Sequence, residues 1–259
     1  MSYFAGIDVG SLTAKAVVLD GDDKVIGYEI LPIGQDSFAA GTSALLQALG
    51  KAGIKREDVK SIVSTGYSRK RFTDVVTTQR TEISCHARGM HAIFPGVTTL
   101  IDIGGQDSKA MRLAKGGKVL DFAMNDKCAA GTGRFVEVMA HALNLTLDGI
   151  SEAALSSKNE LTLSSTCTVF GESEVVSLLS QGNSVPDIAW AIMKSIASRI
   201  IALAKRVGIE QDVAMSGGMA KNKALVENLS DRIGFDIFVP EEPQIIGALG
   251  AALIAKDGG

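Results

Sequence analysis

Aromatic side chains are scarce in this chain of 259 residues, where they make up 5% and include 3 Tyr and 1 Trp. Proteins that bind single-stranded nucleic acid usually stack the bases on aromatic rings. The formal net charge of -3 also provides no attraction toward a polyanion. We therefore expect neither nucleic acid nor an anionic membrane surface as a partner.

The chain also lacks long hydrophobic runs. The longest one, at 245–255, has 11 residues, whereas a helix needs about 20 apolar residues to span a bilayer. The first residues, MSYFAGIDVG, have neither the basic start nor the apolar run of a signal peptide. We expect a cytoplasmic protein that does not enter a membrane.

Cysteine is rare as well, with 3 residues in total. An odd number of thiols, in a compartment that keeps thiols reduced, argues against a disulfide framework. Each cysteine must therefore pack in the core, act as a reactive thiol or bind a metal.

Hydrophobic residues make up 46% of the chain and charged residues 21%. These proportions are ordinary for a globular protein that can bury a hydrophobic core.

A repeat is the strongest internal feature of the sequence. Residues 7–25, IDVGSLTAKAVVLDGDDKV, align without a gap to residues 101–119, IDIGGQDSKAMRLAKGGKV, at an offset of 94. The alignment has 8 identities in 19 positions, where chance gives roughly one, and a single long period indicates two related lobes rather than a solenoid. We predict a boundary near 95–98, with lobes over residues 1–97 and 98–259.

Each copy of the repeat predicts the same local structure. A short apolar strand runs into an Asp-x-Gly turn, and two further strands follow, separated by a turn marked by Gly and Asp. Buried strands are also expected at 59–64 and 212–216, and helices at 38–49, 186–207 and 245–255. This mixture of strands and helices predicts an α/β protein.

Two carboxylates mark a candidate site for a metal and phosphates. Asp8 and Asp102 lie just before the turns of the two copies, and Gly10 and Gly104 let the backbone approach a phosphate and donate N–H groups to it. Mg²⁺ prefers a few carboxylates, phosphate oxygens and retained waters as ligands. Asp8 and Asp102 are therefore the candidate Mg²⁺ residues, with water between the carboxylates and the ion.

Neighbouring side chains suit the hydrolysis of a nucleotide. The hydroxyls of Ser11 and Thr13 can reach a terminal phosphate, and Lys15 and Lys109 can offset its charge. Gln106 is placed to orient an attacking water, the role that Gln takes in other nucleotide hydrolases. The predicted catalytic residues are Asp8, Asp102 and Gln106.

A third motif, SGGMAKNKALVENL at 216–229, follows the expected strand 212–215. Gly217 and Gly218 open a helix there, which lets a nucleotide lie against the backbone. A glycine pair on its own is equally well explained as a tight turn. Three such motifs in this order are harder to explain without a nucleotide.

The motifs GIDVGSLTAKAVVLD, LIDIGGQDSKAMRL and AMSGGMAKNKALVENL resemble the two phosphate motifs and the adenosine motif of the actin, sugar-kinase and heat-shock chaperone ATPase superfamily. The resemblance implies an α/β fold of two duplicated ribonuclease H-like lobes with a nucleotide cleft between them. It does not assign a use for ATP, since the fold hosts kinases, chaperones and filaments. The residues it implies for nucleotide binding are Gly10, Ser11, Leu12, Thr13, Lys15, Gly104, Gly105, Gln106, Gly217, Gly218 and Lys221.

Two cysteines, Cys128 and Cys167, each come just before a helical pattern, at 131–143 and 170–179. A helix N-terminus stabilises a thiolate through its dipole and its free N–H groups. Their spacing alone fits small buried hydrophobes as well. A metal site normally needs about four ligands, and a twofold dimer would supply four thiols from two chains.

The longer strings NDKCAAGTGRF, SSTCTVFGESEV and TEISCHARG resemble the activators of 2-hydroxyacyl-CoA dehydratases, a family that includes the ATP-binding subunits of benzoyl-CoA reductases. The resemblance implies a homodimer with one 4Fe–4S cluster, held by Cys128 and Cys167 of each subunit. It also implies that ATP hydrolysis to ADP, with Mg²⁺, drives an electron from ferredoxin or flavodoxin onto an acceptor iron–sulfur enzyme. That acceptor is a 2-hydroxyacyl-CoA dehydratase, a benzoyl-CoA reductase or another double-cluster protein.

Two other functions also remain possible for this fold. A small-molecule kinase of the same fold needs a catalytic carboxylate ahead of the second phosphate motif, for which Asp74 is the nearby candidate. A filament or chaperone-like module leaves Cys128 and Cys167 unexplained. Cys85, beside His86, is expected to be a packed core residue.

Overall fold

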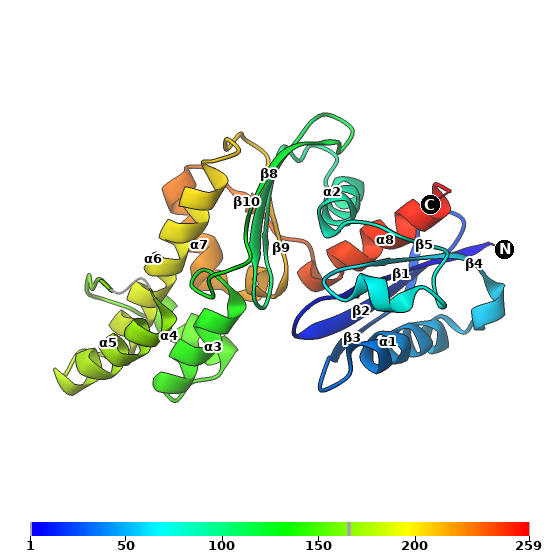
Figure 1. The fold of residues 1–259 in the computed structure, drawn as a ribbon. Coiled ribbons are helices and arrows are strands. Elements are labelled where there is room, and N and C mark those ends of the chain that lie inside the picture. The colour runs from blue at the N-terminus through cyan, green and yellow to red at the C-terminus, as the bar shows by residue number, and fades with distance from the viewer. Residues whose placement is uncertain (1, 165–166, 259) are drawn as a thin grey trace. The chain divides into compact units, whose positions relative to one another are not determined.

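Two compact units make up the chain. The computed structural model describes residues 2–164 and 167–258. One unit comprises Met1–Leu100, Leu113–Leu120 and Pro240–Gly259, and the other comprises Ile101–Arg112 and Asp121–Val239. The C-terminal segment therefore belongs with the N-terminal residues (Figure 1). The limits 1–97 and 98–259, which group that segment differently, stay a prediction.

The first unit is built on a five-stranded sheet. Its strands, in spatial order, are β3 (Val25–Pro32), β2 (Thr13–Leu19), β1 (Tyr3–Val9), β4 (Val59–Thr65) and β5 (Thr78–Gln79). β1, β2 and β3 pair antiparallel, whereas β4 pairs parallel with β1 and with β5. The turn from β2 to β3 is held by Asp20, whose Oδ1 accepts hydrogen bonds from the amides of Asp22 and Lys24 at 2.9 and 3.1 Å. The predicted meander of the first copy is confirmed.

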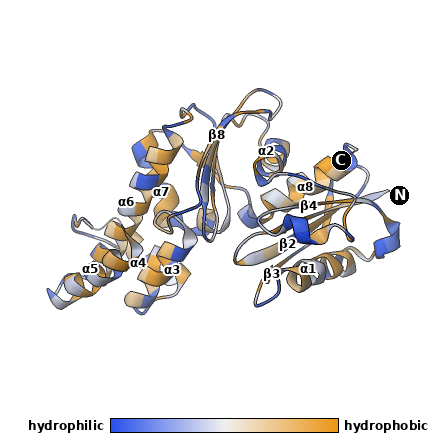
Figure 2. Cartoon of the chain, in the orientation of Figure 1, coloured by the Kyte–Doolittle hydropathy of each residue, from blue (hydrophilic) through white to orange (hydrophobic). Residues whose placement is uncertain are grey.

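Helices cover both faces of this sheet. α1 (Ser37–Ala52) packs on one face, and α8 (Ile246–Lys256) packs on the other with α2 (Glu82–Ile93) beside it (Figure 1). The two helices α8 and α1 lie close to the sheet because β1 and β3 carry glycines. A Cβ on Gly6 in β1 would clash with the carbonyl of Ala248 in α8, and a Cβ on Gly27 in β3 would clash with the carbonyl of Ala48 in α1. α8 is mostly hydrophobic (Figure 2), in keeping with the burial of most of its residues.

The second unit repeats the same strand order. Its sheet runs β8 (Val119–Asn125), β7 (Ser108–Leu113), β6 (Thr99–Ile103), β9 (Val213–Ser216) and β10 (Ile237–Phe238). In both sheets the first strand of the copy lies in the centre, flanked by the second and fourth strands. Two sheets of identical order confirm the duplication that the repeat predicts.

Five helices gather on one side of the second sheet (Figure 1). They are α3 (Gly133–Ala142), α4 (Leu147–Leu155), α5 (Thr168–Ser180), α6 (Val185–Ala204) and α7 (Lys223–Ile233). The core of this unit forms where α6 meets the sheet and α7, and it contains Ile192, Ile196 and Leu225. Short 3₁₀ turns complete the chain, at Arg56–Asp58, Arg69–Phe72, Gly218–Lys221 and Pro243–Ile245.

Every helix and strand predicted by range is present, with ends shifted by a few residues. The helices expected at 38–49, 186–207 and 245–255 are α1, α6 and α8, and the strands expected at 59–64 and 212–216 are β4 and β9. The two-residue strands β5 and β10 are too short to show a periodic pattern. Within the described part of the chain, no helix has the length and hydropathy of a membrane span.

Candidate functional site

The first phosphate motif lies where β1 turns into β2. The amide of Gly10 donates to the carbonyl of Thr13 at 3.1 Å, which closes the turn over Ser11 and Leu12. Asp8, at the end of β1, is buried, and its Oδ2 lies 3.2 Å from Lys15 Nζ. Strand alternation therefore brings Lys15 toward Asp8, and the motif presents both a charged pair and an open backbone turn.

Asp8 has an unused carboxylate oxygen. Its Oδ1 is buried and has no hydrogen-bond partner among the described residues. Space beside the carboxylate is kept by two glycines, because a Cβ on Gly66 would lie 2.5 Å from Oδ1 and one on Gly247 would lie 3.0 Å from Oδ2. A buried acceptor without a donor is costly. An unpaired carboxylate oxygen of this kind fits Mg²⁺ or a water bound to it.

The second phosphate motif repeats this arrangement with a tighter network. Asp102, in β6, is buried; its Oδ2 lies 3.3 Å from Lys109 Nζ, and its Oδ1 accepts from Ser216 Oγ at 2.8 Å. Lys109 also lies 2.9 Å from Asp107 Oδ2. The turn is closed by the amide of Gly104, which donates to the carbonyl of Asp107 at 2.9 Å. Each lysine points toward the carboxylate of the preceding strand, and Asp107 is a further partner of Lys109 that the sequence did not suggest.

The turn after Asp102 is joined to the next helix. The amides of Gly133 and Arg134, at the start of α3, donate to the carbonyls of Gly104 and Gly105 at 2.9 and 2.8 Å. Gln106 lies in the same turn and is exposed. The first turn of α3 is thus joined to the phosphate motif by two backbone hydrogen bonds.

The third motif follows β9 and lies against the second. Gly217 has φ 87°, and a Cβ there would clash with the carbonyl of Ile103 and lie 3.0 Å from Asp102 Oδ1. Only glycine fits this position. The 3₁₀ turn Gly218–Lys221 follows, with Gly218 and Lys221 exposed, and Asn222 caps α7. The second and third motifs therefore meet at Asp102.

Cys128 lies in the exposed loop between β8 and α3. The loop is shaped by Asn125, whose Nδ2 donates to the carbonyl of Cys128 at 2.8 Å and whose Oδ1 accepts from the amide of Cys128 at 3.3 Å. The backbone of Cys128 is therefore held by an amide side chain three residues earlier. That Asn in NDKC is the sequence signal for an organised loop.

Cys167 is exposed and occupies the N-cap of α5. Its carbonyl accepts from the amide of Gly171 at 2.8 Å, so the thiol stands at the first turn. Of the motif SSTCTVFGESEV, residues 165 and 166 lie outside the described part of the chain. The two cysteine-led helices touch, since a Cβ on Gly171 would lie 3.3 Å from Met139 and 3.5 Å from Phe135, both in α3.

The start of α5 exposes large apolar side chains. Val169 and Phe170 are 69% and 68% exposed, and Val176 on the next turns is also exposed. Apolar side chains gathered on a surface commonly mark contact with another chain. Here they adjoin an exposed thiol.

Cys85 has a different environment. It is fully buried in α2, and burial raises the pKa of its thiol to about 12. The side chain packs with Val63 and Ala251, between β4 and α8. The expected assignment of Cys85 as a packed core residue agrees with this burial.

Residues 5–255 match the BadF/BadG/BcrA/BcrD ATPase family, which covers nearly the whole chain. The chain belongs to this family. The match spans the phosphate motifs, the adenosine motif and both exposed cysteines. Nearly the whole chain, residues 5–255, therefore belongs to a family of ATPases.

Relatives of similar length share much of the sequence. The chain is 47% identical to the activator of lactoyl-CoA dehydratase from Anaerotignum propionicum, over 98% of each protein. It is 44% identical to the 2-hydroxyisocaproyl-CoA dehydratase activator from Clostridioides difficile, over 98% of this chain and 95% of the relative. Both relatives are named as activators of 2-hydroxyacyl-CoA dehydratases.

Solved structures agree with the fold. Component A of the Acidaminococcus fermentans (R)-2-hydroxyglutaryl-CoA dehydratase has a TM-score of 0.97 and 41% identity, covering 100% of this chain and 99% of that one. An activator of 2-hydroxyisocaproyl-CoA dehydratase from Clostridium difficile, with bound ADPNP, has a TM-score of 0.93 and 43% identity, covering 99% and 95%. The duplicated lobes have the actin-like ATPase fold, which sugar kinases share at low sequence identity.

Proposed function

We propose that this protein is an ATP-dependent activator that passes single low-potential electrons to a partner iron–sulfur enzyme, a 2-hydroxyacyl-CoA dehydratase. The observation that carries the proposal is the backbone link between the second phosphate turn and α3, at Gly104 and Gly133. The loop of Cys128 leads directly into α3. A change at the phosphate turn therefore acts on the helix that follows the loop of an exposed thiol, Cys128.

ATP and ADP bind through the three motifs in this proposal. The turn at Gly10–Thr13 and the turn at Gly104–Gln106 donate backbone amides to phosphate oxygens. Asp8 and Asp102 hold waters in the shell of Mg²⁺, which neutralises charge that develops on the phosphates. The unpaired Oδ1 of Asp8 supports this role.

Gln106 orients the water that attacks the terminal phosphate. Its exposure leaves the side chain free to face solvent and nucleotide, and its place in the turn keeps it close to the phosphate-binding amides. Lys15 and Lys109 remain paired with Asp8 and Asp102 and offset the negative charge of both carboxylates.

Cys128 and Cys167 are the ligands of a 4Fe–4S cluster in this proposal. Both thiols are exposed. Cys167 is the N-cap of α5, where N–H groups stabilise thiolates and sulfides, and Cys128 lies in the loop that leads into α3. Two thiols are half of a four-ligand set, so a second copy supplies the rest. The apolar side chains of Val169 and Phe170 supply contact area for that homodimer.

In the resulting cycle, the bound nucleotide determines the position of α3. A ferredoxin or flavodoxin delivers one electron to the dimer. Exchange of ADP for ATP changes the contacts at the phosphate turns, and α3 follows because its first amides are bonded to Gly104 and Gly105. Nucleotide drives this change only if it binds the two conformations with different affinity. Hydrolysis restores the first conformation after the electron has passed to the acceptor.

Anaerobic reconstitution tests the proposal. The purified protein is mixed with a 2-hydroxyacyl-CoA dehydratase, a reductant and either ATP or ADPNP, and dehydration of the substrate is followed. We expect dehydratase activity with ATP, and none when protein, ATP or reductant is left out. A benzoyl-CoA reductase component in place of the dehydratase tests the alternative acceptor. A protein that contains no iron and activates neither enzyme would contradict the proposal.

A further inference from the structure

The start of helix α5 buries little of its own surface. The helix has 13 residues, of which only Gly171 and Val175 are buried. Val169, Phe170 and Val176 are exposed, whereas Leu178 and Leu179, near the end of the helix, are half-buried against the core. Yet α5 carries Cys167 at its N-cap, so something else must fix the position of this helix. The connection from α4, residues 156–164, is the part of the chain placed to do so, and we call it the strap.

Asp187 binds the start of the strap. The carboxylate is buried in the first turn of α6, and its Oδ1 accepts hydrogen bonds from Ser157 Oγ at 2.8 Å and from the amides of Lys158 and Asn159 at 3.0 and 3.1 Å. Its Oδ2 accepts from Asn159 Nδ2 at 3.0 Å and from Ser184 Oγ at 2.7 Å. Four of these five bonds come from the strap.

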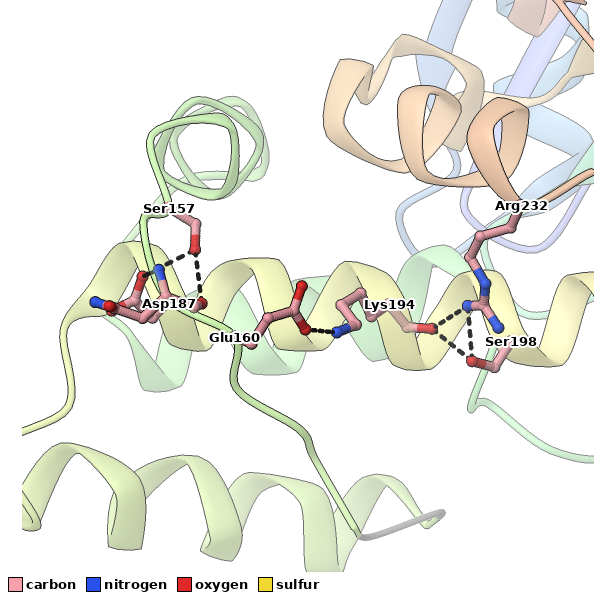
Figure 3. A network of polar contacts seen from close by, with 7 residues as sticks. Ser157, Glu160, Asp187, Lys194, Ser198 and Arg232 are labelled. Carbon is pink, nitrogen blue, oxygen red and sulfur yellow. Dashed lines mark hydrogen bonds and ion pairs between the residues drawn. The ribbon is translucent and has the colours of Figure 1, made fainter. Parts of the chain in front are cut away.

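These contacts go beyond helix capping. Ser184 and Asp187 have the spacing of a capping box, in which the acid normally returns to the amide of the N-cap residue. Here Ser184 accepts from the amide of Asp187, but the carboxylate of Asp187 turns toward the strap (Figure 3). Hydrogen bonds hold the pKa of Asp187 well below its usual range. The bond from Asn159 has the largest effect, and the bond from Ser184 has the next largest. The carboxylate therefore stays ionised at neutral pH.

Further contacts fasten the middle and the end of the strap. Lys194 of α6 pairs with Glu160 (Figure 3), although Glu160 is 83% exposed and such a pair contributes little. Leu163 is buried in the core. The amide and hydroxyl of Ser164 then donate to Glu174 Oε1 at 2.8 and 2.9 Å, which ties the strap to α5 itself.

The same network reaches α7. Arg232, in its last turn, donates to the carbonyl of Lys194 at 3.0 Å and to Ser198 Oγ at 2.9 Å (Figure 3). The strap is thus anchored to the buried helix α6, which is itself fixed by α7. Asp187 is the anchor with the most bonds and the least exposure to solvent.

We infer that Asp187 is a positioning residue for Cys167: it fixes the strap, and the strap holds the start of α5 where its thiol serves as a ligand. The inference rests on the proposed function for the role of that thiol. In this inference Asp187 acts through the strap and is not itself a ligand.

Amide hydrogen exchange of the anaerobically purified dimer tests the inference. We expect the amides of α5 to exchange about tenfold faster in Asp187→Ala than in the wild type, with the amides of α3 unchanged. Iron should also be lost to a chelator faster, by a similar factor, while ATP binding stays the same. Asp187→Asn keeps one carbonyl oxygen as acceptor for the strap, so it should show a smaller change in both measurements.

Controls separate positioning from general stability. Asp231→Ala removes an exposed carboxylate of α7 and should match the wild type in both measurements. If Asp187→Ala fails to fold, Asn159→Ala removes a single strap donor and is measured in the same way. Unchanged exchange in α5 of a folded variant, or equal increases in α5 and α3, would overturn the inference. A wild type without iron would instead overturn the proposed function, and the exchange of α5 would still decide whether Asp187 anchors the strap.

Discussion

The amide of Gly133 donates to the carbonyl of Gly104 at 2.9 Å, which joins the first residue of α3 to the second phosphate turn. A displacement of the turn is passed directly to α3, because the hydrogen bond joins the two backbones without an intervening side chain. The proposed coupling between nucleotide and Cys128 runs through this bond and through the neighbouring bond from the amide of Arg134 to the carbonyl of Gly105 at 2.8 Å.

Replacing Gly133 by proline tests that coupling. Proline removes the N–H but suits the first position of a helix, and Thr132 before it has the extended backbone that proline requires. We expect Gly133→Pro to bind ATP and retain iron but to lose most ATP-dependent activation of the dehydratase. Gly133→Ala keeps the N–H, although its Cβ would lie 3.2 Å from the carbonyl of Gly104, and it is the matched control. Equal activation by the two variants would contradict the coupling.

Loss of a carboxylate from the Mg²⁺ shell should slow hydrolysis strongly. We expect Asp8→Asn and Asp102→Asn each to lower the ATP turnover rate about a hundredfold, which corresponds to about 3 kcal/mol of transition-state stabilisation. Lys109 keeps Asp107 as a partner in the second variant, whereas Lys15 loses its paired carboxylate in the first. Thermal unfolding should therefore shift more in Asp8→Asn. Wild-type turnover in both variants would show that the metal assignment is wrong.

Gln106→Ala separates hydrolysis from binding. An oriented water matters mainly in the transition state, so turnover should fall about tenfold or more while the Kd for ATP stays near that of the wild type. Such a variant should still transfer one electron and then fail to cycle. A parallel loss of affinity and turnover would make Gln106 a binding residue instead.

The thiol of Cys85 should be unreactive at neutral pH. Burial raises its thiol pKa to about 12, so it stays protonated in the folded protein and should resist alkylation when Cys128 and Cys167 in the iron-free protein react. Because this pKa is raised above that of the unfolded chain, its contribution to stability is present below about pH 9 and is lost as the pH rises toward 12. Cys85→Ser should remove that part of the alkaline pH dependence without changing the iron content. Mass spectrometry of alkylated peptides and pH-dependent unfolding check both outcomes.

The sequence predicts the duplicated fold well because each repeat carries its own turns and strand pattern. It does not reveal which buried atoms meet across long distances. Gly66 and Gly247 lie 58 and 239 residues after Asp8 and yet make the space beside its carboxylate. Asp187 reads as an ordinary capping acid, since the strap that it binds is about 30 residues away in the sequence and has no periodic signal.

Iron content and electron paramagnetic resonance test the central claim most directly. A cluster bridging two subunits needs both thiols of both chains, so Cys128→Ser and Cys167→Ser should each remove the brown colour and weaken the dimer, because binding of the shared metal is linked to assembly. Cys85→Ser is the matched control and should do neither. The decisive quantity is the iron bound per dimer in wild-type protein kept strictly anaerobic. We expect about four irons, with the signal of a single reduced 4Fe–4S cluster. Iron near zero would contradict the account, and about eight irons would contradict a shared cluster.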